Sequence, residues 1–525
     1  MPVTVADRSS AERRRRQVLT VLALWLGSRI VLLFLAMNPG VYSGAILGDV
    51  IGYGAKVERM FQGELPYRDV AIEYPPGSLP FTLLPALIVG TGPGYRLAFA
   101  LTMLAVDAVG LAGAFALGRA VDQGRVRVPI AYVLGTFLAG PLLFVRFDIV
   151  PGVCVLLAAL FAVRRRPGLA AAALGYGTAA KLFPVVLAPL LVLGLVPAIG
   201  WLRSFARTVP AFLVGFALTA VPALAISFSG TISSVIGYHT KRGVQIESLW
   251  ANGIEILHVL FKVPAREQYE YGAFDLASGL SGTAKTLSGV ATVVLLAFAA
   301  LVTWRRAGGW PFGRRPAGLR GADWPLVFAL GVFAFMLPTR VLSPQYLFWL
   351  VVLCGAAALP LGRRARTAVA LWCLSGPITQ LIFPFRYNAL RHLAPAEVGL
   401  LTVRNGLLVA AAVVLVRVLW TAPEPAAGGA GRGNGLAGTR PDPDPDGAGS
   451  ERGREGRSTV DRDSAGAARD RHPSSAPPGE GPVGVAAGPE HNPTSRSGVR
   501  GAGGPEHNPT SRGDVSGPGE PDPAA

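Results

Sequence analysis

Long apolar runs alternate with short, arginine-rich polar segments along the first 420 residues. A helix needs about 20 apolar residues, range about 17–25, to cross a bilayer. The first run, about 17–37, follows four arginines. It is longer than a signal-peptide core of about 7–15 residues and no A-x-A cleavage pattern follows, so it predicts a spanning helix. Further spans are predicted over roughly 95–118, 129–146, 149–163, 168–181, 182–200, 209–228, 286–304, 325–338, 345–361, 367–385 and 400–420. The expected fold is an all-α polytopic membrane protein with about 12 transmembrane helices.

The short apolar segment 78–91 is punctuated by Pro and Gly, so it predicts either a further span or an interfacial helix. Cytoplasmic loops carry an excess of Lys and Arg. With both termini inside and 78–91 not crossing, the short inside segments hold 21 Lys/Arg against 4 acidic residues. If 78–91 crossed, arginine clusters at 119–127 and 164–166 would face outward. We therefore expect 78–91 to stay on the outer side.

This topology predicts two large outer segments, 38–94 and 229–285. The second contains an amphipathic stretch with Leu249, Trp250, Leu260 and Phe261, which is typical of a helix lying among lipid headgroups.

Composition agrees with a membrane location. The chain has 525 residues, of which 51% are hydrophobic and only 15% charged, against about 25% charged in soluble domains. The mean hydropathy is +0.43. The formal net charge of +17 is therefore attributed to topology and not to nucleic-acid binding. The bias toward Ala, Gly and Arg over Lys is typical of a GC-rich bacterial genome, which indicates a bacterial plasma membrane. The three cysteines fall within apolar runs and form no CxxC pair, so neither disulfides nor a thiolate metal site is expected.

The chain divides into a cytoplasmic N-terminus, 1–16, a transmembrane domain, 17–420, and a tail, 421–525. Gly and Pro make up 38 of the 105 tail residues, 22 and 16 respectively, which predicts disorder. The sequence GPEHNPTSR occurs twice in the tail, too few copies to indicate a solenoid.

Polar motifs gather on the predicted outer face, whereas the inner loops carry mostly arginine. Charged groups at membrane depth are costly unless they pair or line a wet cavity, so these motifs mark a candidate site. In order they are GDV from Gly48, PYRD from Pro66, EYPP from Glu73, RFD from Arg146, KLFP from Lys181, KRGVQIES from Lys241, SPQY from Ser343 and RYN from Arg386.

The ordered motifs Asp49 with GELPYRDVAIEYPPG, then RFDIVP, AKLFP, KRGVQIES and SPQYLFWL, resemble glycosyltransferase family 87 over roughly residues 17–420. The resemblance implies a GT-C fold and a lipid-phosphate sugar donor, as in the polyprenyl-phosphate-mannose-dependent mannosyltransferases. It also implies an outward-facing active site and inversion at the anomeric carbon. It suggests mannose, although related enzymes use arabinose and other sugars. The expected acceptor is a glycolipid, a polysaccharide or another envelope molecule. No nucleotide-binding loop and no HExxH motif occurs, so no cofactor or metal is predicted.

By position, the resemblance implies that Asp49 is the catalytic general base. The alternative is that Asp49 merely caps a helix over 50–62. Lys181, Arg242, Arg340 and Arg386 are candidates for binding the donor phosphate, because cations stabilise the leaving group. For Lys181, snorkelling to the interface explains the residue as well as phosphate binding does. For Arg242, attraction to lipid headgroups is an equally good alternative. The remaining candidate substrate contacts are Glu73, Tyr74, Asp148, Gln245, Glu247, Gln345 and Tyr346.

Several candidates also have structural alternatives. Asp148 could simply pair with Arg146, and Gln345 and Tyr346 could cap a helix after Ser343. Arg29 and Asp107 lie inside the first two spans and are expected to pair with each other or with a neighbour.

Two other classes of function remain open from sequence alone. A secondary transporter or lipid flippase would show paired broken helices in two similar halves, and no clear half-to-half symmetry is present. A scaffold acting through its tail would leave the outer polar motifs without a purpose.

Overall fold

Helices form at every apolar run that predicts one. The computed structural model describes residues 5–122, 125–311, 318–358 and 363–421. The predicted disordered tail lies outside the described residues. The first elements are α1 (Val5–Met37), η1 (Gly44–Leu47), α2 (Gly48–Phe61), η2 (Pro76–Ser78), α3 (Leu79–Val89), α4 (Tyr95–Val121), α5 (Arg127–Leu138), η3 (Pro141–Phe144), α6 (Ile149–Val163), α7 (Pro167–Ala180), η4 (Phe183–Val186), α8 (Leu187–Ile199) and α9 (Trp201–Ile226).

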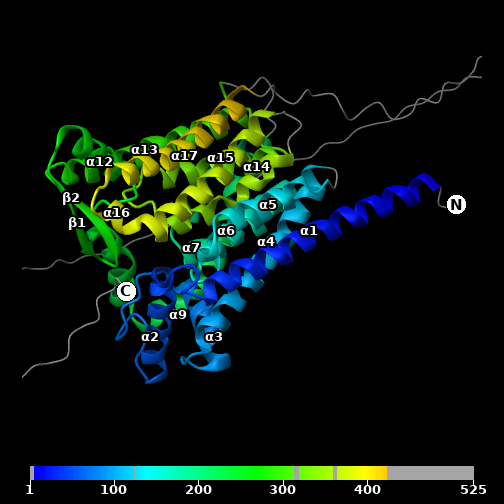
Figure 1. Ribbon diagram of the computed structural model, residues 1–525. Coiled ribbons are helices and arrows are strands. Elements are labelled where there is room, and N and C mark those ends of the chain that lie inside the picture. Colours follow the sequence, from blue (N-terminus) through cyan, green and yellow to red (C-terminus); the bar gives the residue numbers. More distant parts are fainter. Residues whose placement is uncertain (1–4, 123–124, 312–317, 359–362, 422–525) are drawn as a thin grey trace, which may run out of the picture. The chain divides into compact units, whose positions relative to one another are not determined.

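The second half continues with short helices, one hairpin and the last long helices. These are α10 (Phe228–Ile232), η5 (Ser233–Gly237), α11 (Tyr238–Lys241), α12 (Leu249–Phe261), β1 (Ala265–Glu270), β2 (Ala273–Ser278), α13 (Ser281–Arg306), α14 (Asp323–Met336), η6 (Pro344–Ala358), α15 (Arg363–Gln380), η7 (Leu381–Arg386), α16 (Tyr387–Arg391) and α17 (Pro395–Thr421). In Figure 1 the long helices run side by side, while α2, α12, α16 and the hairpin lie at one end of them. We call this the cavity end.

The chain is a multi-pass membrane protein. Among the described residues, six helices are long and apolar enough to span a bilayer: Glu12–Met37, Tyr95–Val121, Trp201–Ile226, Ser281–Arg306, Arg364–Arg391 and Pro395–Thr421. Five of the other six predicted spans are α-helices of about 12–15 residues, or about 18–23 Å at 1.5 Å per residue. These five are shorter than the hydrocarbon thickness of about 30 Å. The sixth, η6, is a 3₁₀ helix of 15 residues, or about 30 Å at about 2.0 Å per residue. Full crossing by these six stays a prediction.

The ambiguous segment 78–91 forms α3, which has 11 residues. Its length of about 17 Å is too short to cross the bilayer. The expectation that it remains on one side is consistent with this length.

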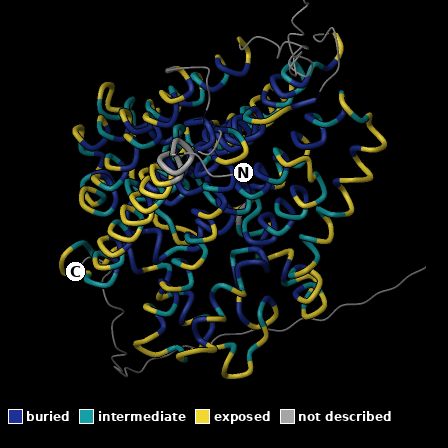
Figure 2. Tube along the Cα trace, turned by 90° about the vertical axis from the view of Figure 1, so that its right-hand side faces the viewer, coloured by how far each residue is buried: buried dark blue, intermediate teal, exposed yellow. Residues whose placement is uncertain are grey.

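Two kinds of helix are distinguished by burial. Nearly every residue of α6, α14 and η6 is buried, as expected for helices that are apolar all round. In contrast, α9 and α13 expose large apolar side chains: Leu218 is 70% exposed and Val293 is 69% exposed. Figure 2 shows buried positions in the interior of the fold and exposed positions along its outer elements. Such apolar faces would be unfavourable in water, so they are the lipid-facing surfaces of the bundle.

A buried ion pair joins the first helices of the bundle. The Arg29 guanidinium on α1 donates to both carboxylate oxygens of Asp107 on α4, at 2.7 and 2.8 Å. Asp107 also accepts hydrogen bonds from Trp25 at 2.6 Å and Tyr132 at 2.9 Å. The predicted pairing of Arg29 with Asp107 is confirmed. Four donors satisfy a carboxylate that would otherwise be an uncompensated charge, and removing one partner of such a pair costs about 3–5 kcal/mol.

Small residues allow α7 and α9 to approach closely. A Cβ at Gly175 would lie 2.1 Å from the carbonyl oxygen of Phe212, and one at Gly215 would lie 2.2 Å from that of Ala172. Glycine at both positions therefore permits near backbone contact, which is how membrane helices gain packing energy where the hydrophobic effect between them is weak.

Outside the helices, the described residues contain one antiparallel hairpin, β1–β2, which departs from a purely helical expectation. Its turn residues, Tyr271 and Gly272, have φ of 49° and 68°. Positive φ at both positions is the geometry of a tight two-residue hairpin. The predicted interfacial helix is α12, with Leu260 and Phe261 exposed and Ala251 and Ile254 buried.

Candidate active site

A polar cavity of about 390 Å³ opens at the cavity end of the bundle. It draws on α2, the segment before η2, the loop between η3 and α6, the segment 238–247, the hairpin, η6, η7 and α16. Its lining residues are Ala45, Gly48, Asp49, Gly52, Tyr53, Lys56, Glu73, Tyr74, Arg146, Tyr238, Arg242, Gln245, Glu247, Tyr269, Gly272, Ala273, Phe274, Ser343, Pro344, Gln345, Phe383 and Tyr387.

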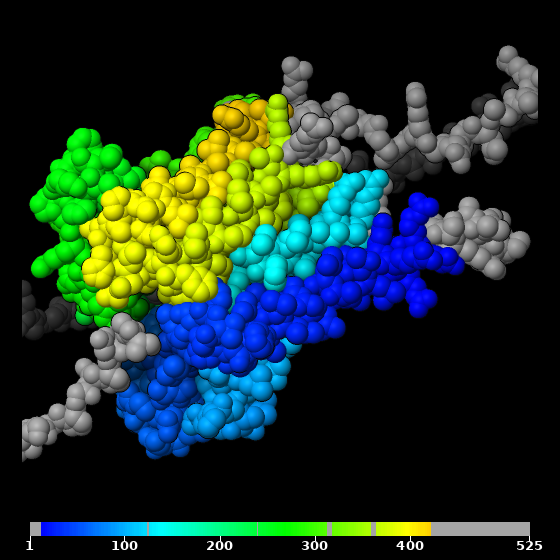
Figure 3. Space-filling view, viewed as in Figure 1, coloured from blue at the N-terminus to red at the C-terminus, as the bar shows by residue number. Residues whose placement is uncertain are grey.

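Segments far apart in the sequence meet beside this cavity. The ring of Tyr42, which precedes α2, lies 4.9 Å from the ring of Phe385 in η7, edge to face. Tyr42 also donates a hydrogen bond to the side chain of Gln380. In Figure 3 the blue surface of the N-terminal part lies directly against the yellow surface of the part that follows residue 363. Because these contacts join residues far apart in the sequence, the cavity forms only when the chain packs into its tertiary structure.

Asp49 lies in the first turn of α2 and faces the cavity. The 3₁₀ turn η1 leads into this helix, whose N-cap is Leu47 with no side-chain cap hydrogen bond. The alternative that Asp49 serves as the N-cap is therefore wrong. Its carboxylate Oδ2 instead lies 3.0 Å from Nε of Arg146, and the two side chains are 29% and 12% exposed.

Arg146 is the cavity cation that pairs with Asp49. Nε of Arg146 makes no hydrogen bond to a described residue, although it lies close to the Asp49 carboxylate. Its guanidinium carbon lies 5.7 Å from the ring centre of Phe383. Sequence reasoning considered Arg146 only as a partner of Asp148, so this role was missed. The RFD motif that contains it was the available signal.

The segment 242–247 is fixed to two neighbours before it reaches the cavity. Its backbone pairs with Arg340, Phe274 and Leu276 through bonds of 2.8 to 3.0 Å. The Gln245 side chain accepts a hydrogen bond from Leu342 N at 2.8 Å and donates one to Glu247 Oε2 at 2.9 Å. Gln245 and Glu247 therefore have defined orientations in the cavity wall.

Arg242 lies beside these residues with hydrogen-bonding capacity to spare. Its guanidinium carbon is 5.8 Å from the ring centre of Tyr238, and its buried Nε has no hydrogen-bond partner among the described residues. Gln345 likewise carries a buried Oε1 with no partner in the described part of the chain. Buried polar atoms are normally satisfied, so these two are free to bind a polar ligand.

Glu247 is buried, with 1% of its surface exposed. Burial raises the pKa of the Glu247 carboxyl to about 7, and the nearby Arg404 and Arg146 oppose this effect. One oxygen of the carboxyl lies 3.3 Å from Nη2 of Arg404. Glu247 can thus change its protonation state near neutral pH.

We expect the Glu247→Gln variant to weaken the pH dependence of stability. The folded-state pKa lies above the ordinary value of 4.5, so the folded protein binds this proton more tightly than the unfolded chain does. The stabilising contribution is present below pH 4.5 and is lost as the pH rises through about 7. The Tm of the purified variant should therefore fall less steeply than that of the wild type between about pH 5 and 8.

Glu58→Gln is the matched control, because Glu58 is exposed. Burial raises the pKa of the Glu255 carboxyl to about 8, so Glu255 maintains part of the pH dependence of Tm in every variant. A wild-type slope in Glu247→Gln would contradict the assignment.

The segment that carries Glu73 and Tyr74 is docked onto the end of α7. Glu73 forms an ion pair with Lys56 on α2. Three residues after Tyr74, a Cβ on Gly77 would lie 2.5 Å from the carbonyl carbon of Ala179 and 2.6 Å from its oxygen. Only glycine permits this approach, because backbone atoms cannot yield as a flexible side chain can.

Gly77→Ala is therefore expected to lower stability by about 1–3 kcal/mol, the usual effect of overpacking. The measurement is the Tm of the detergent-purified protein. Gly92→Ala is the control, since its added Cβ would meet nothing within 4 Å. Equal Tm values for the two variants would refute the proposed close contact.

Not every candidate residue lines the cavity. Lys181, Asp148 and Tyr346 lie behind its aromatic wall, and Asp148 pairs with Lys181 at 2.6 Å. The alternative that Asp148 only pairs with Arg146 is wrong. Arg386 is 53% exposed and pairs with Glu397 at 2.6 Å, and Arg340 is likewise not among the lining residues.

Several lining side chains were not among the candidates from the sequence. Tyr53, Lys56, Tyr238, Phe274 and Phe383 lie outside the motifs that were singled out, and Tyr387 lies in the RYN motif, from which only Arg386 was chosen. Among the described residues, no group of three or more His, Cys, Asp or Glu side chains could hold a metal ion.

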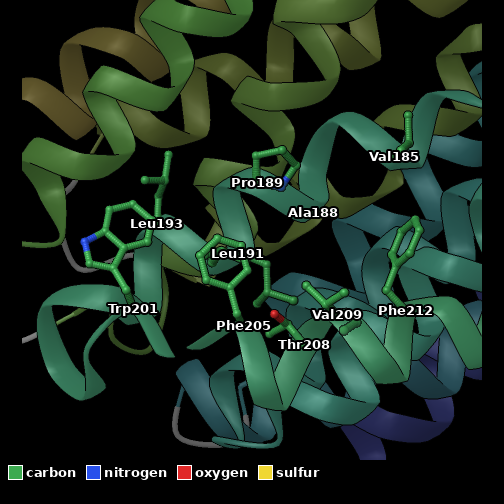
Figure 4. A pocket seen from close by; sticks show the side chains of 12 residues that line it. Val185, Ala188, Pro189, Leu191, Leu193, Trp201, Phe205, Thr208, Val209 and Phe212 are labelled. Atoms are coloured by element: carbon green, nitrogen blue, oxygen red, sulfur yellow. The ribbon is translucent and has the colours of Figure 1, made fainter. Parts of the chain in front are cut away.

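Two apolar grooves accompany the polar cavity. One, of about 430 Å³, lies among α7, α8 and α9, with Trp201, Phe205 and Phe212 projecting from α9 toward α8 (Figure 4). The other, of about 600 Å³, lies among α12, α13, α14 and α17 and includes Trp250 and Pro338. Both can hold hydrocarbon.

No protein-family profile matches the chain, and no curated protein sequence matches it. Among solved structures, the chain is similar to the crystal structure of ArnT from Cupriavidus metallidurans bound to undecaprenyl phosphate. The sequence identity is 17%, the TM-score is 0.40 and the match covers 77% of each chain. A likeness at this level assigns neither a fold family nor an activity to the present chain.

Proposed function

We propose that the chain is a membrane glycosyltransferase of the GT-C type, resembling family 87. It transfers a hexose, mannose by that resemblance, from a polyprenyl-phosphate donor to a glycolipid, polysaccharide or other envelope acceptor. The excess of Lys and Arg in the predicted inner loops supports placing the cavity end on the outer face and both termini in the cytoplasm.

The observation that carries this proposal is convergence. Four separate motifs of the resemblance contribute side chains to one cavity, and a fifth motif, that of Lys181, lies directly behind its wall. The first motif contributes Asp49, Glu73 and Tyr74, and RFDIVP contributes Arg146. KRGVQIES contributes Arg242, Gln245 and Glu247, and SPQYLFWL contributes Gln345. A volume of about 390 Å³ is within the range of about 300–1,000 Å³ found for small-molecule sites.

Asp49 is the proposed general base. The acceptor hydroxyl oxygen forms a bond to the anomeric carbon, and the bond from that carbon to the phosphate oxygen breaks with inversion. The hydroxyl proton passes to Asp49, and the bonding electron pair leaves with polyprenyl phosphate. Such proton transfer contributes about 10²–10⁴-fold to a rate.

Arg146 links the base to the leaving group. While Asp49 is ionised, Arg146 has a negative partner 3.0 Å away. Once Asp49 accepts the proton, it is neutral, and the positive charge of Arg146 is available to the phosphate as that group becomes more negative. Arg242, with its free Nε, supplies the second cation, and an arginine can bind phosphate in a bidentate manner.

The uncharged and acidic lining residues are suited to sugar hydroxyls. Gln245, Glu247 and Gln345 present oriented oxygen and nitrogen atoms at the cavity wall. The polyprenyl chain is assigned to the groove among α12, α13, α14 and α17, because Leu249 and Trp250 at this groove closely follow Glu247 in the sequence. The reaction therefore has a polar chamber beside an apolar one.

Membranes containing the full chain should move label from polyprenyl-phosphate-[³H]mannose into a product that resists mild acid. The corresponding arabinose donor tests the choice of sugar. If the donor is translocated across proteoliposomes without a new glycosidic bond, the transporter or flippase alternative is supported and the transferase proposal fails.

Deleting residues 423–525 is expected to leave transfer activity within about twofold of the full chain, because every lining residue of the cavity precedes this tail. The measurement is the initial transfer rate per mole of membrane-inserted protein. A loss of transfer with normal insertion would instead assign the tail a part in catalysis. Intact transfer combined with failed rescue of a cellular phenotype would add a scaffold role.

A further inference from the structure

Lys181 is an enclosed cation next to the cavity, and its surroundings do not suit a phosphate ligand. Its side chain is 12% exposed. Four aromatic rings surround its ammonium nitrogen, with centres 5.3 to 5.5 Å away, and they belong to Tyr74, Phe147, Tyr346 and Trp349. Rings at this distance stabilise a cation but leave little room for a second anion.

Asp148 already neutralises the ammonium group. Its Oδ1 lies 2.6 Å from Nζ of Lys181 and accepts a hydrogen bond of 2.8 Å from Nε1 of Trp349. The Asp148 side chain is 2% exposed. The charge of Lys181 is therefore matched internally, within an aromatic enclosure that lies behind the cavity wall.

Three consecutive residues connect this pair to the cavity. Arg146 pairs with Asp49 and Asp148 pairs with Lys181, and Phe147 lies between Arg146 and Asp148 in the sequence. Phe147 also packs edge to face on Tyr74, with ring centres 4.8 Å apart. Anchoring Asp148 thus fixes the backbone from which Arg146 reaches the cavity.

We propose that Lys181 and Asp148 are positioning residues that hold Arg146 and Tyr74 in their working orientation, and that Lys181 does not bind the donor phosphate. This inference rests on the proposed function and deepens it. It removes one of the four cations that the sequence offered as phosphate ligands. Two separate ion pairs result: Asp49 with Arg146 in the cavity, and Asp148 with Lys181 behind its wall.

A double-mutant cycle separates positioning from phosphate binding. The variants are Lys181→Met, Asp148→Asn and the double variant, each prepared as the full chain in proteoliposomes. Removing one partner leaves a buried charge unpaired, whereas removing both does not. Each single variant should therefore lower Tm and transfer rate, and the double variant should recover most of the Tm.

The kinetic constants of the double variant distinguish a positioning role of Lys181 from phosphate binding. In the wild-type background, positioning predicts a kcat lowered by about tenfold, because Arg146 is less well oriented. In an Arg146→Gln background, it predicts no further change in donor KM, because the pair then has no arginine to orient. A donor KM raised about tenfold or more in that background would identify Lys181 as a phosphate ligand and overturn the inference. A wild-type kcat would also overturn it, since the pair would then be only structural.

The buried pair Arg306–Asp323 provides a matched control. Its charges lie 2.9 Å apart and the side chains are 9% and 11% exposed, and neither residue lines the cavity. Arg306→Met with Asp323→Asn should leave kcat unchanged. If the wild type transfers no sugar from any donor, the proposed function and its catalytic consequence here both fail, whereas the Tm cycle still measures the coupling of Lys181 with Asp148.

Discussion

Asp49→Asn is expected to lower the transfer rate by about 10²–10⁴-fold while the donor KM changes little. The substitution keeps the shape of the side chain and removes its capacity to accept the acceptor proton. Because Asp49 makes no helix-capping hydrogen bond, α2 should still form. The measurement is kcat with saturating donor, together with the Tm of the purified variant.

Asp69→Asn is the matched control for this experiment. Asp69 lies in the same segment between α1 and α4, but it is exposed, pairs with Arg68 and does not line the cavity. It should retain transfer. Equal rates for Asp49→Asn and the wild type would eliminate Asp49 as the base.

Arg146→Gln should have the second largest effect, a loss of about 10²–10³-fold in kcat/KM for the donor. The variant lacks the charge that is assigned to the leaving phosphate, and it leaves Asp49 without its cation. Unlike Asp49→Asn, it should also raise the donor KM, because phosphate binding begins in the ground state. Arg146→Lys should be intermediate, since an ammonium group keeps the charge but not the planar guanidinium fork.

Arg68→Gln serves as the control for charge alone, because Arg68 is 57% exposed, pairs with Asp69 and does not line the cavity. Its kcat/KM should equal that of the wild type. An unchanged donor KM in Arg146→Gln would remove Arg146 from the phosphate site and leave Arg242 as the cavity cation that binds phosphate.

Sequence patterns located the helices well and the hairpin not at all. Apolar runs such as 95–118 and 400–420 predict α4 and α17 because a membrane helix needs a long apolar segment wherever it lies. The hairpin β1–β2 is short and mostly polar, with Tyr271 at its turn, so it gives no comparable signal. Whether each shorter helix crosses the bilayer also depends on its neighbours, which periodicity cannot supply.

The sequence predicted which residues lie near the candidate site better than it predicted which of them form ion pairs. The motifs at Asp49, Glu73, Arg242 and Gln345 were expected on one face, and all four residues line the cavity. Arg386 was expected there as well but lies at the surface, paired with Glu397. Their chemical roles remain predictions.

Hydropathy and charge along the chain are enough to predict repeated membrane spans and the gathering of polar motifs on one face, because each residue carries these properties in any fold. Which opposite charges meet depends on how the helices pack: Asp49 pairs with Arg146, and Asp148 with Lys181. Ion pairs act over a few ångströms between residues that can be 97 positions apart, so chain packing chooses the partner and sequence spacing does not.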